Sequence, residues 1–323
     1  MLEAIVSAGP KVEIVNSPVP TPGPTQVLIK VVVAAANPKD WKVPEWTGKQ
    51  INTGDDGAGI VEAVGERVSD FRKGDRVAGF HEMGGPSGTY VDFEEASPVP
   101  LTAGTAAAGL FEEDGGLGLP LPSSPPYETI PLVIYGASGS VGAFAVQLAK
   151  KANIHPLICV AGGGAKTIEH LLDTSKGDTI VDYRKGDEAV TKGIKAALAG
   201  KTLKHALDTT AHGSTSVNIA KAMTEGGTIA RTLGPEGELP NGVKQFQLSV
   251  STVHSPQQEF GATMFKLFGQ GLQQGRLQPR PYEVVRGGLN MLEKALADLK
   301  AGKASAVKYV LRIDETDGVD GMS

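Results

Sequence analysis

The sequence predicts an α/β protein in which a β-rich domain is interrupted by a domain built on a doubly wound parallel sheet. A short apolar strand, a glycine-rich turn and an amphipathic helix follow one another within residues 131–151. Strands and helices then alternate as far as residue 232, which is typical of a parallel sheet covered by its crossover helices. Before residue 100, short strand signals are separated by Gly and Pro, which indicates a small barrel or sandwich.

The strands expected before residue 100 are apolar or alternating runs that end at turn residues. Lys73-Gly74-Asp75 is one such turn. A first hairpin is expected from two short runs separated by a turn, at residues 4–7 and 12–15. Further strands are expected at residues 26–36, 59–64, 76–80 and 88–93.

Beyond residue 102 the pattern changes to helices and strands in alternation. Residues 105–111 form an apolar helical segment, and a loop rich in Gly, Pro and Ser follows over residues 113–126. A loop of that length is either functional or mobile. The strands of the parallel sheet are expected at residues 131–135, 155–160, 179–182, 205–208 and 227–232. The helices between them are expected at residues 140–151, 166–172, 188–199 and 214–223.

The last section returns to mixed structure. It contains helical patterns, a terminal strand pattern and an acidic tail from Asp314 that we expect to be disordered. The helices are expected near residues 259–274 and 288–302, and the strand at residues 306–313. These patterns predict a β-rich domain formed by residues 1–125 and 255–323, with an inserted domain at residues 126–254.

The glycine turn after residue 135 carries the strongest chemical signal. The dinucleotide pattern G-x-G-x-x-G falls on Ala137, Gly139 and Gly142, so its first glycine is replaced and Gly136 stands one place earlier. Glycine lets the backbone turn sharply and approach a pyrophosphate, while the first N–H groups of the helix point at its charge. A glycine-rich turn of an unrelated α/β protein is the alternative interpretation. The residues predicted to bind the cofactor here are Gly136, Ala137, Ser138, Gly139, Ser140, Val141 and Gly142.

Composition excludes several classes of partner. The net charge of −5 argues against nucleic acid or an anionic membrane as the main partner. The single cysteine, Cys159, excludes an internal disulfide and a thiolate-rich zinc cluster. No stretch approaches the ~20 apolar residues of a membrane-spanning helix, and the start has no signal-peptide pattern. We therefore expect a cytoplasmic protein without a membrane partner, although an organelle address read by a receptor stays open.

Several sequence blocks in order resemble the medium-chain dehydrogenase/reductase superfamily. They are Gly-Asp-Asp-Gly-Ala-Gly-Ile-Val at residues 54–61, Val64-Gly65, Lys-Gly-Asp-Arg-Val at residues 73–77, and the glycine turn. The resemblance covers nearly the whole chain. It implies a GroES-like β-rich catalytic domain with an inserted Rossmann domain.

The positions that hold catalytic zinc in the zinc alcohol dehydrogenases of this superfamily are changed. There the first block reads Gly-His-Glu-x-x-Gly, and its histidine and an upstream cysteine bind the metal. Here Asp55 stands at the histidine place, Asp56 at the glutamate place and Asn37 at the cysteine place. Aspartates do not make a zinc site without His or Cys. We therefore expect no metal and nearly exclude a zinc alcohol dehydrogenase.

The remaining similarity is to the zinc-independent quinone oxidoreductases and enoyl reductases. Residues 37–42, 105–111 and 117–122 resemble fungal enoyl reductase-like proteins, including those that act in trans on polyketide synthases. The resemblance implies an NADPH-dependent reductase of quinones or activated C=C bonds, acting on a small hydrophobic electron-poor quinone, enone or enoyl thioester. The alternatives are a trans-acting enoyl reductase of polyketide-type metabolism and a non-catalytic NADPH-binding protein. The resemblance also implies a homo-oligomer, usually a dimer.

The residues after the second expected strand favour NADPH over NADH. A carboxylate about 20 residues past the glycine turn would bind the ribose hydroxyls of NAD, but residues 159–166 contain no acid. Gly163 is expected to contact the cofactor in this loop, and Lys166, four places after Gly162, can supply charge to a 2′-phosphate. The resemblance adds Tyr183 as a contact of that phosphate. The alternative is a solvated lysine and an ordinary strand-end tyrosine.

The resemblance also nominates residues near the nicotinamide, and the expected reaction requires a donor to the oxygen on which negative charge develops. Lys42 is the first candidate for a charged donor to the developing oxyanion, and Tyr90 is the second, since tyrosine can act as a general acid. The alternatives are a surface lysine and a tyrosine packed in a barrel. The residues expected near the nicotinamide are Asn37, Pro38, Thr105, Leu233 and Lys308.

Overall fold

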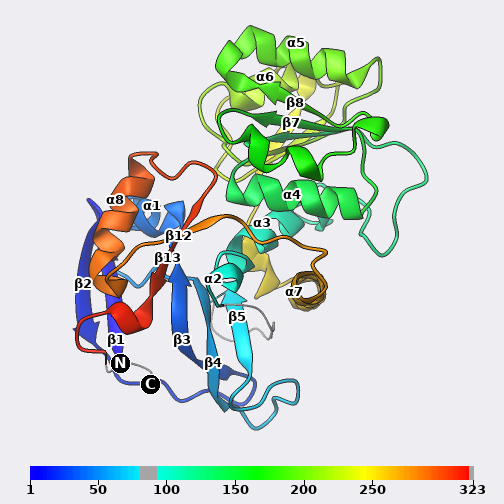
Figure 1. Cartoon of the computed structure of the whole chain (residues 1–323). Coiled ribbons are helices and arrows are strands. Elements are labelled where there is room, and N and C mark those ends of the chain that lie inside the picture. Colours follow the sequence, from blue (N-terminus) through cyan, green and yellow to red (C-terminus); the bar gives the residue numbers. More distant parts are fainter. Residues whose placement is uncertain (81–92, 320–323) are drawn as a thin grey trace. The chain divides into compact units, whose positions relative to one another are not determined.

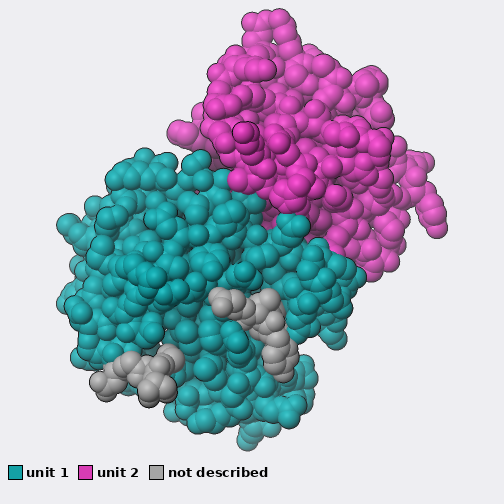
Figure 2. Space-filling model, viewed as in Figure 1, with its two compact units in different colours: residues 1–101, 256–323 teal, residues 102–255 magenta. Residues whose placement is uncertain are grey.

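The computed structural model describes residues 1–80 and 93–319. The chain divides into two units, which Figure 2 shows in different colours. The first unit combines Met1–Leu101 with Pro256–Ser323, and the second is Thr102–Ser255. A parallel-sheet unit is thus inserted in the sequence of a β-rich unit, as expected. The predicted domain boundaries at 125/126 and 254/255 stay a prediction.

Five strands form the main sheet of the first unit: β3 (Val27–Ala35), β4 (Asp56–Val64), β5 (Arg76–Phe80), β12 (Tyr282–Val284) and β13 (Lys308–Arg312). Their order is β12-β13-β3-β4-β5, and β3, β4 and β5 form an antiparallel meander. β13 pairs antiparallel with β3 and parallel with β12. The C-terminal strand therefore lies inside the sheet and joins the two parts of the unit (Figure 1).

A hairpin and several helices complete the first unit. The hairpin is antiparallel, and its apolar residues pack with those of the helix near the C-terminus and of β13 in one core cluster. The hairpin consists of β1 (Leu2–Ser7) and β2 (Lys11–Asn16). The helices are α1 (Pro38–Thr47), α2 (Phe93–Ala96), α7 (Gln258–Gln273) and α8 (Leu292–Lys300), and α3 (Pro100–Phe111) begins here and continues into the second unit.

Six parallel strands form the sheet of the second unit: β6 (Leu132–Tyr135), β7 (Leu157–Ala161), β8 (Thr179–Asp182), β9 (His205–Asp208), β10 (Thr228–Arg231) and β11 (Lys244–Gln247). Their order is β11-β10-β9-β6-β7-β8. Strands β7 and β8 are added on one side of β6 and strands β9 to β11 on the other, so the topological switch point lies between β6 and β9. Ligands of open α/β sheets bind at such a switch point, beyond the carboxyl ends of the strands. Besides most of α3, the α-helices of this unit are α4 (Ser140–Lys151), α5 (Asp187–Leu198) and α6 (Thr215–Ala220).

Most expected elements are present, and the predicted fold class is confirmed. The 113–126 loop folds back on α3, where Leu117 N donates to Gly109 O and Leu119 N to Leu110 O. Within residues 1–80 and 93–319, no helix combines the length and apolar character that crossing a bilayer requires.

Some local expectations are wrong. The helix expected at residues 166–172 is two short 3-10 helices, Ala165–Thr167 and Glu169–Leu171. The helix expected at residues 288–302 is split into a 3-10 turn, Gly288–Met291, and α8. The strand expected at residues 88–93 lies outside the described residues except for Phe93, which begins α2.

The acidic tail is ordered as far as the structure describes it, contrary to expectation. A Glu315 carboxylate oxygen accepts a hydrogen bond from Gly287 N, and Thr316 Oγ1 accepts one from Leu289 N. The tail thereby holds the turn that leads into α8. The acidic composition of the tail predicted disorder. That prediction failed because local composition contains no information about contacts with a distant segment of the chain.

Candidate functional site

The glycine turn of the second unit has the close packing that the dinucleotide pattern requires. Gly136 follows β6 with φ of 75°, a left-handed conformation that suits glycine. A Cβ on Gly142 would lie 2.3 Å from Gly136 O, so α4 can pack on the turn only because this residue has no side chain. The helix therefore starts directly at the carboxyl end of β6. Its first turn presents backbone N–H groups that have no partner within the helix.

A polar side chain from the neighbouring strand braces this turn. Thr209 follows β9, and its Oγ1 donates to Tyr135 O at 2.8 Å and to Gly136 O at 3.3 Å. Fully buried Asp208, the last residue of β9, accepts from Ala211 N at 2.7 Å, Thr215 Oγ1 at 2.6 Å and Ser216 Oγ at 2.8 Å. Neither Thr209 nor Asp208 was predicted as a site residue from the sequence. The available signal was a run of polar residues directly after an expected strand of a parallel sheet.

The loops after β7 and β8 contact each other where the 2′-phosphate is expected. A Cβ on Gly162 would lie 2.5 Å from the Tyr183 ring, so the ring lies against the backbone of this glycine, while Tyr183 stays 48% exposed. A Cβ on Gly163 would meet no atom within 4 Å. Lys166 is exposed. The loop therefore offers open space, an aromatic ring and a cation, and no carboxylate.

Arg184 adds a second cation beside Tyr183. Its guanidinium donates to both carboxylate oxygens of Asp182, with Nε 2.9 Å from Oδ1 and Nη2 2.7 Å from Oδ2. Hydrogen bonds from the Arg184 side chain lower the pKa of Asp182 to about 2. The pair fixes the direction of the guanidinium at the exposed end of β8. The Arg184 guanidinium at this end of the sheet is therefore already paired with a carboxylate, whereas Lys166 is an exposed cation.

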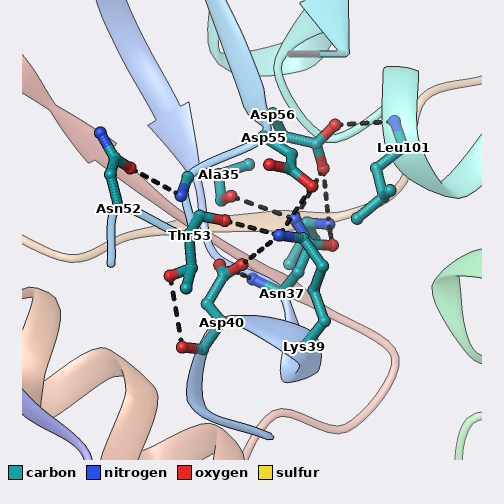
Figure 3. Close-up of polar contacts among 11 residues, drawn as sticks. Ala35, Asn37, Lys39, Asp40, Asn52, Thr53, Asp55, Asp56 and Leu101 are labelled. Carbon is teal, nitrogen blue, oxygen red and sulfur yellow. Dashed lines mark hydrogen bonds and ion pairs between the residues drawn. The ribbon is translucent and has the colours of Figure 1, made fainter. Parts of the chain in front are cut away.

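In the first unit, a buried polar network surrounds Asn37 (Figure 3). Asn37 is 2% exposed, and its Nδ2 donates to Asp56 Oδ2 at 2.9 Å. The Lys308 ammonium, 4% exposed, donates to Asn37 Oδ1 and, at 3.1 Å, to Asp56 Oδ2. Asp56 Oδ1 accepts from Leu101 N at 2.7 Å. One carboxylate therefore holds the starts of α1 and α3 and the start of β13.

A second group of charges adjoins the first through α1. The Lys39 ammonium donates to Thr53 O at 2.7 Å and pairs with Asp55 Oδ2 at 2.6 Å and Asp40 Oδ1 at 3.3 Å. Asp40 Oδ2 accepts from Asn37 N at 2.8 Å and so holds the beginning of the helix. Burial raises the pKa of Asp40 to about 7. This carboxyl can therefore change its protonation state near neutral pH.

The two positions compared with zinc ligands have ammonium partners. Asp55 is paired with Lys39, and Asn37 accepts from Lys308. In the described part of the chain, no three side chains of His, Cys, Asp or Glu are grouped to hold a metal ion. The donor set of this network is thus an amide, carboxylates and two ammonium groups, which is unlike the His and Cys ligands of a zinc site.

Lys42, the first catalytic candidate, lies between aromatic rings on α1. Its ammonium is 5.5 Å from the ring centroid of Trp41 and 6.0 Å from that of Trp46, within cation–π range. Burial lowers the pKa of Lys42. Its predicted role is not tested by this geometry and stays a prediction. Tyr90, the second candidate, lies outside the described residues.

The other predicted residues fall into two groups, each within one unit. In the first unit Asn37 and Lys308 contact each other, and Pro38 is the first residue of α1. In the second unit Thr105 is a buried residue of α3, and Leu233 lies half-buried in the loop after β10. Their roles in cofactor binding stay predictions.

Comparison with known proteins identifies the chain. The family model of the alcohol dehydrogenase GroES-like domain matches residues 23–114. The trans-enoyl reductase fsr4 of Gibberella fujikuroi is 43% identical over 311 residues, covering 89% of this chain and 91% of that protein. The trans-enoyl reductase ACTTS2 of Alternaria alternata is 30% identical over 357 residues, covering 96% and 98%.

Solved structures share the fold. The CurK enoyl reductase has a TM-score of 0.71 at 21% identity, covering 96% of this chain and 98% of that one. The Pseudomonas syringae quinone oxidoreductase has a TM-score of 0.74 at 20% identity, covering 96% and 100%. The GroES-like domain and the inserted parallel sheet together define a medium-chain dehydrogenase/reductase. Within its zinc-independent branch, the chain belongs to the trans-enoyl reductase family.

The Asp56–Lys308 pair should be strongly coupled. Lys308→Met leaves a buried carboxylate without its ammonium and should lower the free energy of unfolding by about 3–5 kcal/mol. The double variant Asp56→Asn/Lys308→Met removes both charges and should be more stable than the sum of the single changes predicts. Urea unfolding of the four proteins measures this, with exposed Lys192→Met as the control. Additive effects would contradict the coupling.

Asp40 should make stability depend on pH. Its folded-state pKa of about 7 lies above the ordinary 3.8, so between these values only the unfolded chain gives up the proton. Stability should therefore fall as pH rises from about 4 to about 7, by at most ~1.4 kcal/mol per pH unit. Asp40→Asn should flatten this part of a urea-midpoint profile, whereas Asp114→Asn at an exposed site should not. An unchanged profile in Asp40→Asn would show that another group dominates.

Proposed function

We propose that this protein is an NADPH-dependent reductase of activated C=C bonds that acts on enoyl thioesters. The observation that carries the proposal is the 43% identity with a trans-enoyl reductase over nearly the full length of both chains. The trans-enoyl reductase ACTTS2 supports it at 30% identity. The cytoplasmic location, the homodimer and action in trans on a polyketide synthase belong to the same proposal.

The second unit supplies a suitable place for the dinucleotide. The turn at residues 136–142 brings backbone N–H groups to the carboxyl end of β6, and the missing Cβ of Gly142 keeps α4 close to it. A pyrophosphate placed there would be bound by backbone donors and by the helix dipole. Thr209 Oγ1 holds the turn in shape by its bond to Tyr135 O. The site is therefore preformed for an anion.

The loops after β7 and β8 support NADPH over NADH. Lys166 and Arg184 offer two cations to a 2′-phosphate, and Tyr183 offers a ring beside Gly162. Arginine binds phosphate oxygens in a planar, directed way, and Asp182 already fixes its guanidinium. A carboxylate that would bind the ribose hydroxyls of NAD is absent from residues 159–166.

When bound at this site, NADPH would supply a hydride to the electron-poor β-carbon of the substrate, and negative charge would then develop on the thioester oxygen until the α-carbon takes up a proton. The protein's task is to present donors to that oxygen and to provide a proton. Lys42 is the proposed donor to the oxygen on which negative charge develops. The burial that lowers the pKa of Lys42 makes its proton easier to give. Tyr90 is the second proposed donor. Asn37, fixed on both sides by Lys308 and Asp56, gives α1 a rigid start.

Turnover with three acceptors tests the activity. With NADPH the protein should reduce a crotonyl thioester or an enone, measured as loss of reduced-nicotinamide absorbance, and Lys42→Met should lower kcat by about 10²-fold or more. Lys201→Met at an exposed site is the control. Reduction of 9,10-phenanthrenequinone alone would place the protein with the quinone reductases. Tight NADPH binding with no acceptor reduced would favour a non-catalytic binding protein.

Cofactor preference tests the phosphate site separately. Lys166→Ala and Arg184→Gln should each raise the Kd for NADPH roughly tenfold, because each removes a cation facing the 2′-phosphate. The Kd for NADH should change less than twofold. Exposed Lys192→Ala should leave both values unchanged. Equal losses for the two cofactors would show that these residues do not read the phosphate.

A further inference from the structure

Arg231 is a buried charge that the proposed chemistry does not use. It is the last residue of β10, is 1% exposed and is among the largest fully buried side chains of the protein. Its Nη1 donates to Gly234 O at 2.7 Å and Gln245 Oε1 at 3.1 Å, and its Nη2 donates to Ala211 O at 3.2 Å. Desolvating a guanidinium is costly, so its acceptors must hold it well.

The three acceptors belong to three separate segments, two of which are loops at the carboxyl edge of the sheet. Ala211 lies in the loop after β9, Gly234 in the loop after β10, and Gln245 on β11. Gln245 Nε2 in turn donates to Gly237 O at 2.7 Å, which extends the connection along the loop after β10. One guanidinium therefore fixes the loops that border the switch point on the β9–β10 side.

Asp208 completes this arrangement from the neighbouring strand. Asp208 is the residue opposite Arg231 in the parallel register of β9 and β10. Its carboxylate accepts from Ala211 N at 2.7 Å, while Arg231 donates to Ala211 O at 3.2 Å. Ala211 has a φ of 48°, a left-handed conformation that is unfavourable for alanine and persists only where surrounding contacts impose it. The shape of this loop is thus imposed by two buried charged groups.

We propose that Arg231 is a positioning residue for the nicotinamide end of the cofactor. This inference rests on the proposed function and on the expectation that residues near Leu233 lie beside the nicotinamide. Arg231 fixes the carbonyl of Gly234, the next residue, and so holds the backbone of residues 232–234 in one conformation before the cofactor arrives. A preformed backbone loses less conformational freedom on binding than a loop that must first be ordered. The guanidinium acts through this loop and needs no contact with the cofactor.

Binding of two ligands to Arg231→Met separates positioning from general structural support. Methionine is long and unbranched but cannot hold three carbonyl-type oxygens. The Kd for NADPH should rise about tenfold. The Kd for adenosine 2′,5′-bisphosphate, which has the phosphorylated adenosine but no nicotinamide, should change less than twofold. Equal rises for both ligands, or no rise for either, would overturn the proposal.

Two further variants keep the test decisive if Arg231→Met does not fold. Gln245→Leu retains Arg231 but removes one acceptor, and it should raise the Kd for NADPH about threefold with the bisphosphate unchanged. Arg184→Gln is the comparison variant at the adenosine end. It should raise the Kd for both NADPH and the bisphosphate, because both ligands carry the phosphorylated adenosine. Wild-type protein that binds neither ligand would overturn the proposed function itself. If the wild-type protein binds both ligands, and the Kd for NADPH is unchanged in Gln245→Leu and Arg231→Met, only the positioning role is overturned.

Discussion

The first unit depends on one buried carboxylate. Asp56 is 2% exposed and receives hydrogen bonds from Asn37, Lys308 and Leu101, which come from three stretches of chain. Asn37 and Lys308 are 271 residues apart in sequence. The insertion of a second unit separates the two parts of this one, so the contacts that join them, among them this network and the pairing of β13 with β3, must be specific as well as strong. A buried charge with matched donors meets this need, because any mispairing would leave it unsatisfied.

The second unit uses buried polar groups for a different purpose, which is to shape loops. Thr209 fixes the glycine turn. Asp208 accepts a hydrogen bond from the backbone N–H of Ala211, and Arg231 donates one to its carbonyl oxygen. The apolar strands and α4 supply the stability, and the polar residues at the ends of the strands define the edge where ligands of such sheets bind. The glycine turn after β6 and the loop after β9 are thus each held by more than one hydrogen bond from a neighbouring segment.

The sequence predicted what local patterns determine. The period of the apolar residues and the spacing of the glycines located five of the six strands of the parallel sheet, α4, and the strands β3, β4 and β5, but not β11 or the strand pairing of the first unit. α1 was missed, because Pro38 and Pro44 lie in it and its motif residues were considered for chemistry rather than for helix formation. The networks around Asp56 and Arg231 were also missed. Each depends on partners brought together by tertiary packing, and no spacing in one sequence reports which distant residues will meet.

The place of β13 inside its sheet sets the order in which the chain can be completed during synthesis. β11 ends at Gln247, so the sheet of the second unit has all its strands well before the chain ends. The first unit lacks β13 until Arg312 has left the ribosome. Its β3 therefore keeps an unpaired edge while the inserted unit can already fold, and unpaired edges are sites of mispairing between chains. Truncation before Lys308 would remove β13 and leave that edge of β3 unpaired permanently, not only during synthesis.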